Sequence, residues 1–148
     1  MNALLDADAT DIAHRIAARE VSAGEAVEAA IAAVEQVNPR LNAVVHKMYD
    51  SARELAQSGT LSGPFAGVPI AVKDFDGFVA GEPFTASTRF LEGFRPTRDA
   101  EVIARLRRAG FVFIGKTNCP ELAILGTTES AWRGAACNPW HTDHSTGG

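Results

Sequence analysis

Apolar residues recur at helical spacing through residues 1–40, which predicts two helices in this part of the chain. The first begins at Asp8, because an aspartate just before an amphipathic segment is a typical N-cap. Ser22 and Glu25 have the spacing of a capping box and begin the second helix, whose apolar face carries Val27, Ile31 and Val34. We expect this helix to end at Asn38-Pro39, because the residue before a proline avoids the helical conformation.

Residues 41–148 alternate short apolar runs with amphipathic segments. These predict strands at residues 41–48, 68–72 and 111–114, and helices at residues 50–57 (capped by Asp50), 99–110 (beginning at Asp99) and 120–125. Residues 75–94 lack periodicity and predict an ordered loop, a kind of segment that often carries function. Strands that alternate with helices predict an α/β fold with a largely parallel sheet.

The composition places the chain among ordinary globular domains. It has 148 residues, of which 46% are hydrophobic, and a net charge of −4 that gives no argument for nucleic-acid or anionic-membrane binding. Two cysteines are too few for a disulfide framework and suggest a reducing compartment. No signal-peptide pattern and no apolar run of about 18 residues is present, so we expect a cytoplasmic protein.

One stretch, Gly67-Val68-Pro69-Ile70-Ala71-Val72-Lys73-Asp74, combines a predicted buried strand with a charged end. Burial at the end of a strand disfavours the charged form of a lysine, so Lys73 has the position of a general base. The alternative is a strand that reaches the surface, with Lys73 as an ordinary solvated charge beside Asp74. This stretch alone leaves both interpretations open.

Residues 110–117 match the letters of a phosphate-binding P-loop, with Gly110 first and Gly115-Lys116-Thr117 last. In a P-loop, a strand precedes the first glycine and the four variable residues form a loop around the phosphates. Here a predicted helix precedes Gly110, and the four residues are a predicted strand. The sequence therefore predicts that this segment does not bind a nucleotide.

Other polar residues carry no recognisable chemistry of their own. The histidines and acidic groups near the end of the chain match no zinc-ligand spacing, and a polar loop accounts for Cys137, His141, Asp143 and His144. No Gly-x-Ser-x-Gly elbow surrounds a serine, and turn or cap roles suffice for Ser87, Ser130 and Ser145.

Taken together, three separated segments resemble the amidase signature family in order and spacing. They are residues 67–74, residues 115–118 (Gly-Lys-Thr-Asn), and Asn138-Pro139-Trp140 followed by Gly147-Gly148. The helix before residue 110 and the Thr128-Glu129-Ser130 loop are also similar to the family, as is the N-terminal helical pair. The likeness covers nearly the whole chain.

The resemblance implies an α/β/α sandwich around a mixed, largely parallel sheet, and cleavage of carboxamides through an acyl-enzyme with a Ser–Ser–Lys triad. Lys73 matches the lysine of that triad, which in neutral form accepts a proton from a bridging serine held by a cis peptide. Ala123, Ile124 and Leu125 correspond to a segment near the acyl pocket. Where relatives usually have Gly-Ser, this chain has Ala86-Ser87.

The family's two serines follow the position of Gly147-Gly148, where this chain stops. We therefore expect residues 1–148 to be an incomplete amidase-type domain, helical in 1–40 and sheet-forming in 41–148, and inactive alone. The resemblance implies a small-molecule amide as substrate and no cofactor, metal, membrane or direct nucleic-acid partner. Two alternatives stay open: the A subunit of a glutamine-dependent tRNA amidotransferase, and a non-catalytic remnant. For partners, a second copy of the chain and other amidotransferase subunits both stay open.

Overall fold

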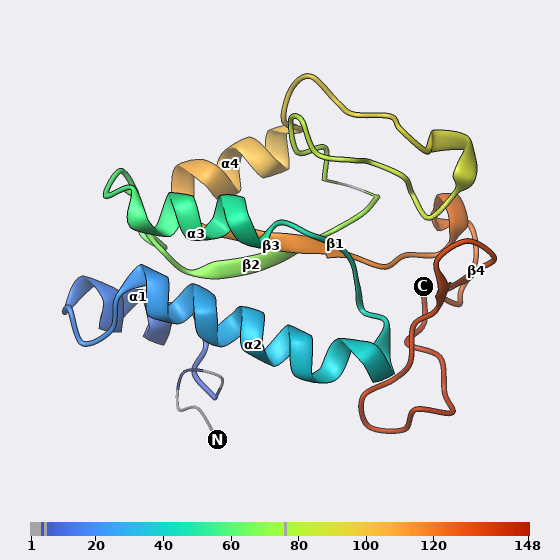
Figure 1. The fold of residues 1–148 in the computed structure, drawn as a ribbon, viewed down its shortest axis with the longest axis horizontal. Helices are drawn as coiled ribbons and strands as arrows, with labels where there is room; N and C mark the ends of the chain where they lie inside the picture. Colours follow the sequence, from blue (N-terminus) through green and yellow to red (C-terminus); the bar gives the residue numbers. More distant parts are fainter. Residues whose placement is uncertain (1–3, 5, 76) are drawn as a thin grey trace.

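The computed structural model describes residue 4, residues 6–75 and residues 77–148 (Figure 1). Its elements are α1 (Ala9–Ala17), α2 (Ala23–Leu41), β1 (Val44–Lys47), α3 (Tyr49–Gln57), β2 (Pro69–Lys73), α4 (Glu101–Ala109), β3 (Val112–Thr117), β4 (Glu129–Ser130) and β5 (Gly134–Ala135), with single 3₁₀ turns at Arg89–Leu91 and Glu121–Ala123. None of the helices within these described residues is both long and apolar enough to cross a membrane.

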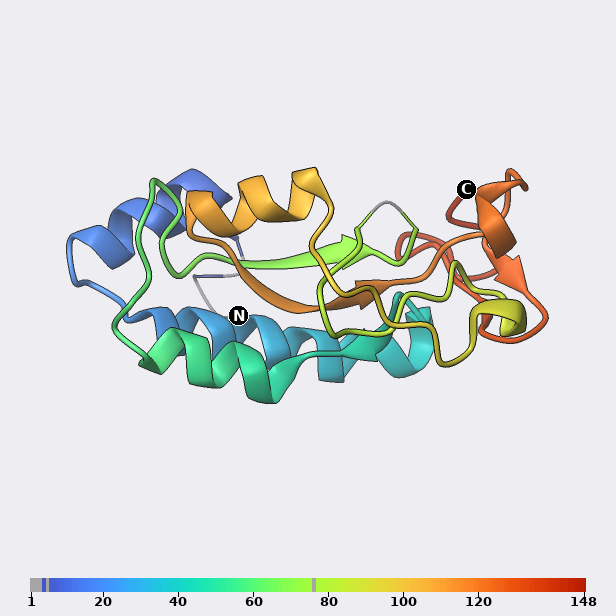
Figure 2. The ribbon, with the colours of Figure 1, turned by 90° about the horizontal axis from the view of Figure 1, so that it is seen from above.

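The main sheet has three strands in the order β1-β3-β2. Strand β2 runs parallel to β3, whereas β1 runs antiparallel to it, so the sheet is mixed. Figure 2 shows α4 on one side of the strands and α2 with α3 on the other. This helix–sheet–helix layering confirms the expected α/β fold.

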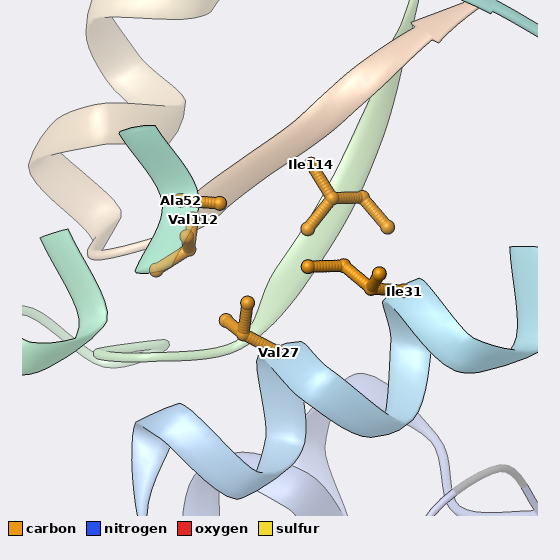
Figure 3. Close-up of a cluster of buried hydrophobic side chains, with 5 residues drawn as sticks. All are labelled: Val27, Ile31, Ala52, Val112 and Ile114. Atoms are coloured by element: carbon orange, nitrogen blue, oxygen red, sulfur yellow. The ribbon is translucent and has the colours of Figure 1, made fainter. Parts of the chain in front are cut away.

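Each face of β3 packs against a different helix layer. Val112 and Ile114 lie against Val27 and Ile31 of α2 and against Ala52 of α3 (Figure 3). Phe113 points to the other face, where it joins a cluster with Met48, Val72, Val79 and Ile103. Alternation along the strand therefore divides one apolar run between two cores.

The predicted starts of the first two helices are confirmed. The Asp8 side chain accepts hydrogen bonds from the amides of Thr10 and Asp11. Ser22 and Glu25 complete a capping box in both directions. Gly110 ends α4 in the left-handed conformation (φ 97°) that favours glycine.

The expected end of α2 at Asn38-Pro39 is wrong, because the helix continues to Leu41. Proline lacks an amide hydrogen and so removes one bond of the last turn. The turn is still closed by the Asn42 amide, which donates to the Asn38 carbonyl at 2.8 Å. The Asn38 side chain also pairs with both backbone groups of Val44, which fixes the chain as it enters β1.

Several other boundaries differ from the prediction. Strand β1 covers Val44–Lys47 only, because the helix occupies the start of the expected range. Neither expected aspartate cap forms: α3 has no side-chain cap, and Asp99 instead accepts bonds from the Ala80 amide and from Arg107. The loop of residues 75–94 is irregular except for Arg89–Leu91, and residue 76 lies outside the described residues.

Tyr49 joins α3 to α2 through a 2.7 Å hydrogen bond from its hydroxyl to Glu35, which also pairs with Lys47 at 2.6 Å. Burial and this bond to a carboxylate raise the pKa of Tyr49 to about 12. Because an unfolded tyrosine ionises near pH 10, the stabilisation from this group is complete below pH 10. It is lost as the pH rises toward 12.

Tyr49 is the only tyrosine in the chain, so its ionisation can be followed directly by ultraviolet absorbance. We expect a midpoint near pH 12 in the folded chain. Substitution E35Q should move the midpoint toward the ordinary value of about 10, and Y49F should remove the signal. A midpoint near 10 in the folded parent chain would contradict the contact with Glu35.

Candidate active site

Lys73 is the last residue of β2 and lies opposite Thr117 of β3. Because the two strands are parallel, their carboxyl ends meet at the same edge of the sheet. The Lys73 side chain is half-buried, and its ammonium forms no hydrogen bond or ion pair with any of the described residues. A lysine in this position is available to exchange a proton with a group that approaches the sheet edge.

The next residue, Asp74, is almost completely buried, and both its backbone and its side chain form hydrogen bonds. Its amide donates to the Thr117 carbonyl at 3.0 Å, and its carbonyl accepts from the Ala86 amide at 3.0 Å. Its carboxylate accepts hydrogen bonds from the amide and the hydroxyl of Thr85. The backbone that carries Lys73 is therefore fixed immediately after the lysine.

Lys116 supplies the counter-ion of Asp74. Its ammonium lies 3.2 Å from the carboxylate and donates to the Pro83 carbonyl at 2.6 Å, with the ring of Phe84 5.4 Å away. The Lys116 side chain is 0% exposed. Burial lowers the pKa of Lys116, and the neighbouring Asp74 counteracts part of this effect.

The strand expected at residues 111–114 is longer than predicted, since β3 continues through Thr117. Gly115 allows this extension because a side chain there would meet the His46 carbonyl of β1 at 2.6 Å. Asn118 follows the strand and accepts bonds from the Ser87 hydroxyl and the Cys119 amide. The Gly-Lys-Thr-Asn segment is thus a strand end that is tied to the loop of residues 75–94.

Four non-glycine residues near this edge have left-handed backbone conformations: Ala86, Ser87, Leu122 and Ala123. Such conformations cost about 1 kcal/mol each and tend to cluster at functional sites. The two pairs are connected, because the Leu122 amide donates to the Ala86 carbonyl at 2.9 Å. Ala86 in turn binds Asp74, so backbone bonds link residues 122–123 to the end of β2.

The helix expected at residues 120–125 is reduced to a single 3₁₀ turn, Glu121–Ala123, because Leu122 has a non-helical backbone. Ala123 is half-buried, whereas Ile124 and Leu125 are 74% and 59% exposed. Gly148 packs against the Leu125 carbonyl, and the Gly147 carbonyl accepts a bond from Thr128. The structure therefore brings Leu125 and Gly147-Gly148 together.

The burial of Lys116 and its contact with Asp74 were not predicted from the sequence. Each residue stands one position beyond an apolar run, where a charged side chain normally marks a strand reaching water, so the local pattern contained no signal for their contact. The β4–β5 hairpin was not predicted either, because its segment lacks apolar alternation. No group of three or more histidine, cysteine or acidic side chains within the described part of the chain is arranged to hold a metal.

The fold and this edge define a class of protein: a mixed sheet between helix layers, with a lysine at the carboxyl end of a parallel strand. The family model described as Amidase matches residues 25–148. The chain therefore belongs to the amidase family.

Known relatives match almost the whole chain. A 6-aminohexanoate-cyclic-dimer hydrolase of Paenarthrobacter ureafaciens is 43% identical over 95% of this chain and 29% of its own length. The A subunit of a glutamyl-tRNA(Gln) amidotransferase of Rhodopirellula baltica is 37% identical over 95% of the chain and 29% of its own length. The chain thus spans about 30% of the length of these relatives.

Solved structures agree with this assignment. A 6-aminohexanoate cyclic dimer hydrolase complexed with substrate superposes with a TM-score of 0.90 at 42% identity, covering 96% of this chain and 30% of that chain. A bacterial aryl acylamidase of the amidase signature family gives a TM-score of 0.87 at 31% identity, covering 96% of this chain and 31% of that chain. The fold of these residues is therefore that of the corresponding part of amidase signature enzymes.

The match to the P-loop letters leads to a prediction. Lys116 is buried and engaged with Asp74 and Pro83, and residues 112–117 are strand, so neither a lysine nor a ring of amides is free for a phosphate. We expect calorimetry to detect no saturable binding of ATP by the chain. Saturable binding that K116A abolished while K47A preserved it would contradict this structure of the segment.

Proposed function

We propose that the chain contributes the lysine of a Ser–Ser–Lys amidase, which hydrolyses the C–N bond of a small carboxamide. The observation that carries this proposal is the half-buried Lys73 at the end of β2, whose ammonium is unengaged among the described residues. Membership of the amidase family supports it. No cofactor enters this proposal.

In the proposed reaction, the neutral amine of Lys73 accepts a proton from a bridging serine, and that serine deprotonates the nucleophilic serine. The nucleophile then attacks the amide carbonyl, and water later releases the acyl group as the acid. The family resemblance implies that both serines follow the position of Gly147-Gly148. The role of residues 1–148, which we regard as an incomplete amidase-type domain, is to present the base at a fixed position.

Residues 123–125 are proposed to line the acyl side of the pocket. Their position supports this, because the Leu125 carbonyl lies close to Gly148, next to which the family's serine segment would begin. Exposed Ile124 and Leu125 would favour an apolar acyl group. We further propose a cytoplasmic location, since two cysteines without a disulfide suit a reducing compartment.

A second candidate function is that of the A subunit of a glutamine-dependent tRNA amidotransferase. The observation that favours it is the 37% identity to the corresponding protein of Rhodopirellula baltica. The same lysine chemistry would then release ammonia from glutamine beside other subunits. Glutamine hydrolysis that rises when those subunits and tRNA are added would select this candidate over a free-standing amidase.

The proposal is tested by joining this chain to its natural downstream coding sequence and assaying a panel of simple amides. We expect K73A to lower kcat by about 10²–10⁴-fold, the contribution typical of a general base. The matched control is K47A on β1, which β3 separates from β2; Lys47 forms a partly exposed ion pair with Glu35, and its substitution should keep full activity.

Three other outcomes of this assay would each contradict part of the proposal. Equal activity of K73A and the parent enzyme would exclude Lys73 as the base. Turnover by residues 1–148 alone, lost in K73A, would mean that a serine within this chain acts as the nucleophile. A joined protein that folds but turns over no amide, glutamine included, would favour a non-catalytic remnant.

A further inference from the structure

Lys116 is the largest fully buried side chain in the described part of the chain, and the proposed reaction does not use it. Removing an ammonium group from water is costly unless the group is paired and hydrogen-bonded. Here Asp74 and the Pro83 carbonyl supply those partners. The cost of burying this charge implies that Lys116 has a specific role at its position in the fold.

The strand register places Lys116 and Lys73 on opposite faces of the sheet. Lys116 is the β3 partner of Val72, whose side chain packs in the cluster on the α4 side. Ala71 packs in the cluster on the α2 side. Because side chains alternate along a strand, Lys73 leaves β2 on the same side as Ala71, whereas Asp74 joins Lys116 on the α4 side.

The buried contact joins three segments at one point. Lys116 belongs to β3, Asp74 directly follows β2, and Pro83 with Thr85 belongs to the loop of residues 75–94. One positive and one negative charge cancel within the contact. The strand end is thereby anchored from the α4 side without a counter-ion being directed toward Lys73.

We propose that Lys116 and Asp74 are positioning residues for Lys73. Their contact fixes the carboxyl end of β2 from the α4 side, so that the Lys73 amine leaves from the opposite side in a defined direction. This inference rests on the proposed function of Lys73 as a base. It is nevertheless testable on residues 1–148 without an activity assay.

The experiment compares the parent chain with K116M and with the double variant D74N/K116M. The double variant leaves neither partner as an unpaired buried charge, so it retains the fold even if K116M does not. The matched control is E28Q, which removes the exposed ion pair between Glu28 and Arg53. Circular dichroism verifies that each variant is folded before measurement.

Two local properties are then measured. The first is hydrogen exchange of the Asp74 and Ala86 amides relative to amides within α2. The second is competitive labelling of Lys73 by an amine-reactive reagent relative to Lys47, read by peptide mass spectrometry. In D74N/K116M we expect the two amides to exchange at least about tenfold faster relative to α2, and the Lys73:Lys47 labelling ratio to change by about threefold or more. E28Q should change neither.

A stabilising role alone would give a different pattern. Exchange of the Asp74 and Ala86 amides in step with α2, or a labelling ratio within about twofold of the parent chain, would overturn the proposal. These readouts are independent of the amidase assay. Failure of K73A to affect turnover would refute the proposed base, whereas an unchanged labelling ratio would refute only the positioning role.

Discussion

The end of the sheet depends on the burial of a complete ion pair between Lys116 and Asp74. Transferring each of these charges out of water costs several kcal/mol, and only close partners in good geometry offset that cost. The partners come from three places in the sequence: β3, the residue after β2, and residues 83–85. The pair can therefore exist only when the two strand ends and the loop are all in place.

This requirement explains why the loop of residues 75–94 is ordered despite having little regular structure. The Asp74 carboxylate accepts hydrogen bonds from the hydroxyl and the amide of Thr85, and the Asp74 carbonyl accepts one from the Ala86 amide. These bonds hold Ala86 and Ser87 in left-handed conformations that an isolated chain would rarely adopt. The conformation of this loop is therefore determined by its hydrogen bonds to Asp74 rather than by the backbone preferences of its own residues.

Much of the fold could be predicted because its signals are local. The capping box of Ser22 and Glu25, the glycine after α4 and the apolar runs of β2 and β3 each act through neighbours in sequence. The predicted end of α2 was wrong because a contact between Asn38 and Val44 replaces what Pro39 removes. The candidate base Lys73 was identified only through its family resemblance, since its own stretch fits a solvated lysine equally well.

The burial of Lys116, by contrast, depends on a residue that is distant in the sequence, and for that reason it was not predicted. A lysine after an apolar run normally marks the point where a strand reaches water. Whether the strand continues depends on a carboxylate 42 residues earlier in the chain, and local pattern carries no information about that partner.

Two relatives, a cyclic-dimer hydrolase and an amidotransferase subunit, match this stretch at 43% and 37% identity, each over 29% of its length. A segment that both relatives share is expected to contribute a feature that does not depend on the substrate. A lysine held by backbone bonds at Asp74 and Thr117 fits that requirement, because backbone bonds do not depend on which side chains surround a substrate. Under the proposed function, specificity can vary at residues 123–125, of which Ile124 and Leu125 are exposed, while the proposed base stays in place.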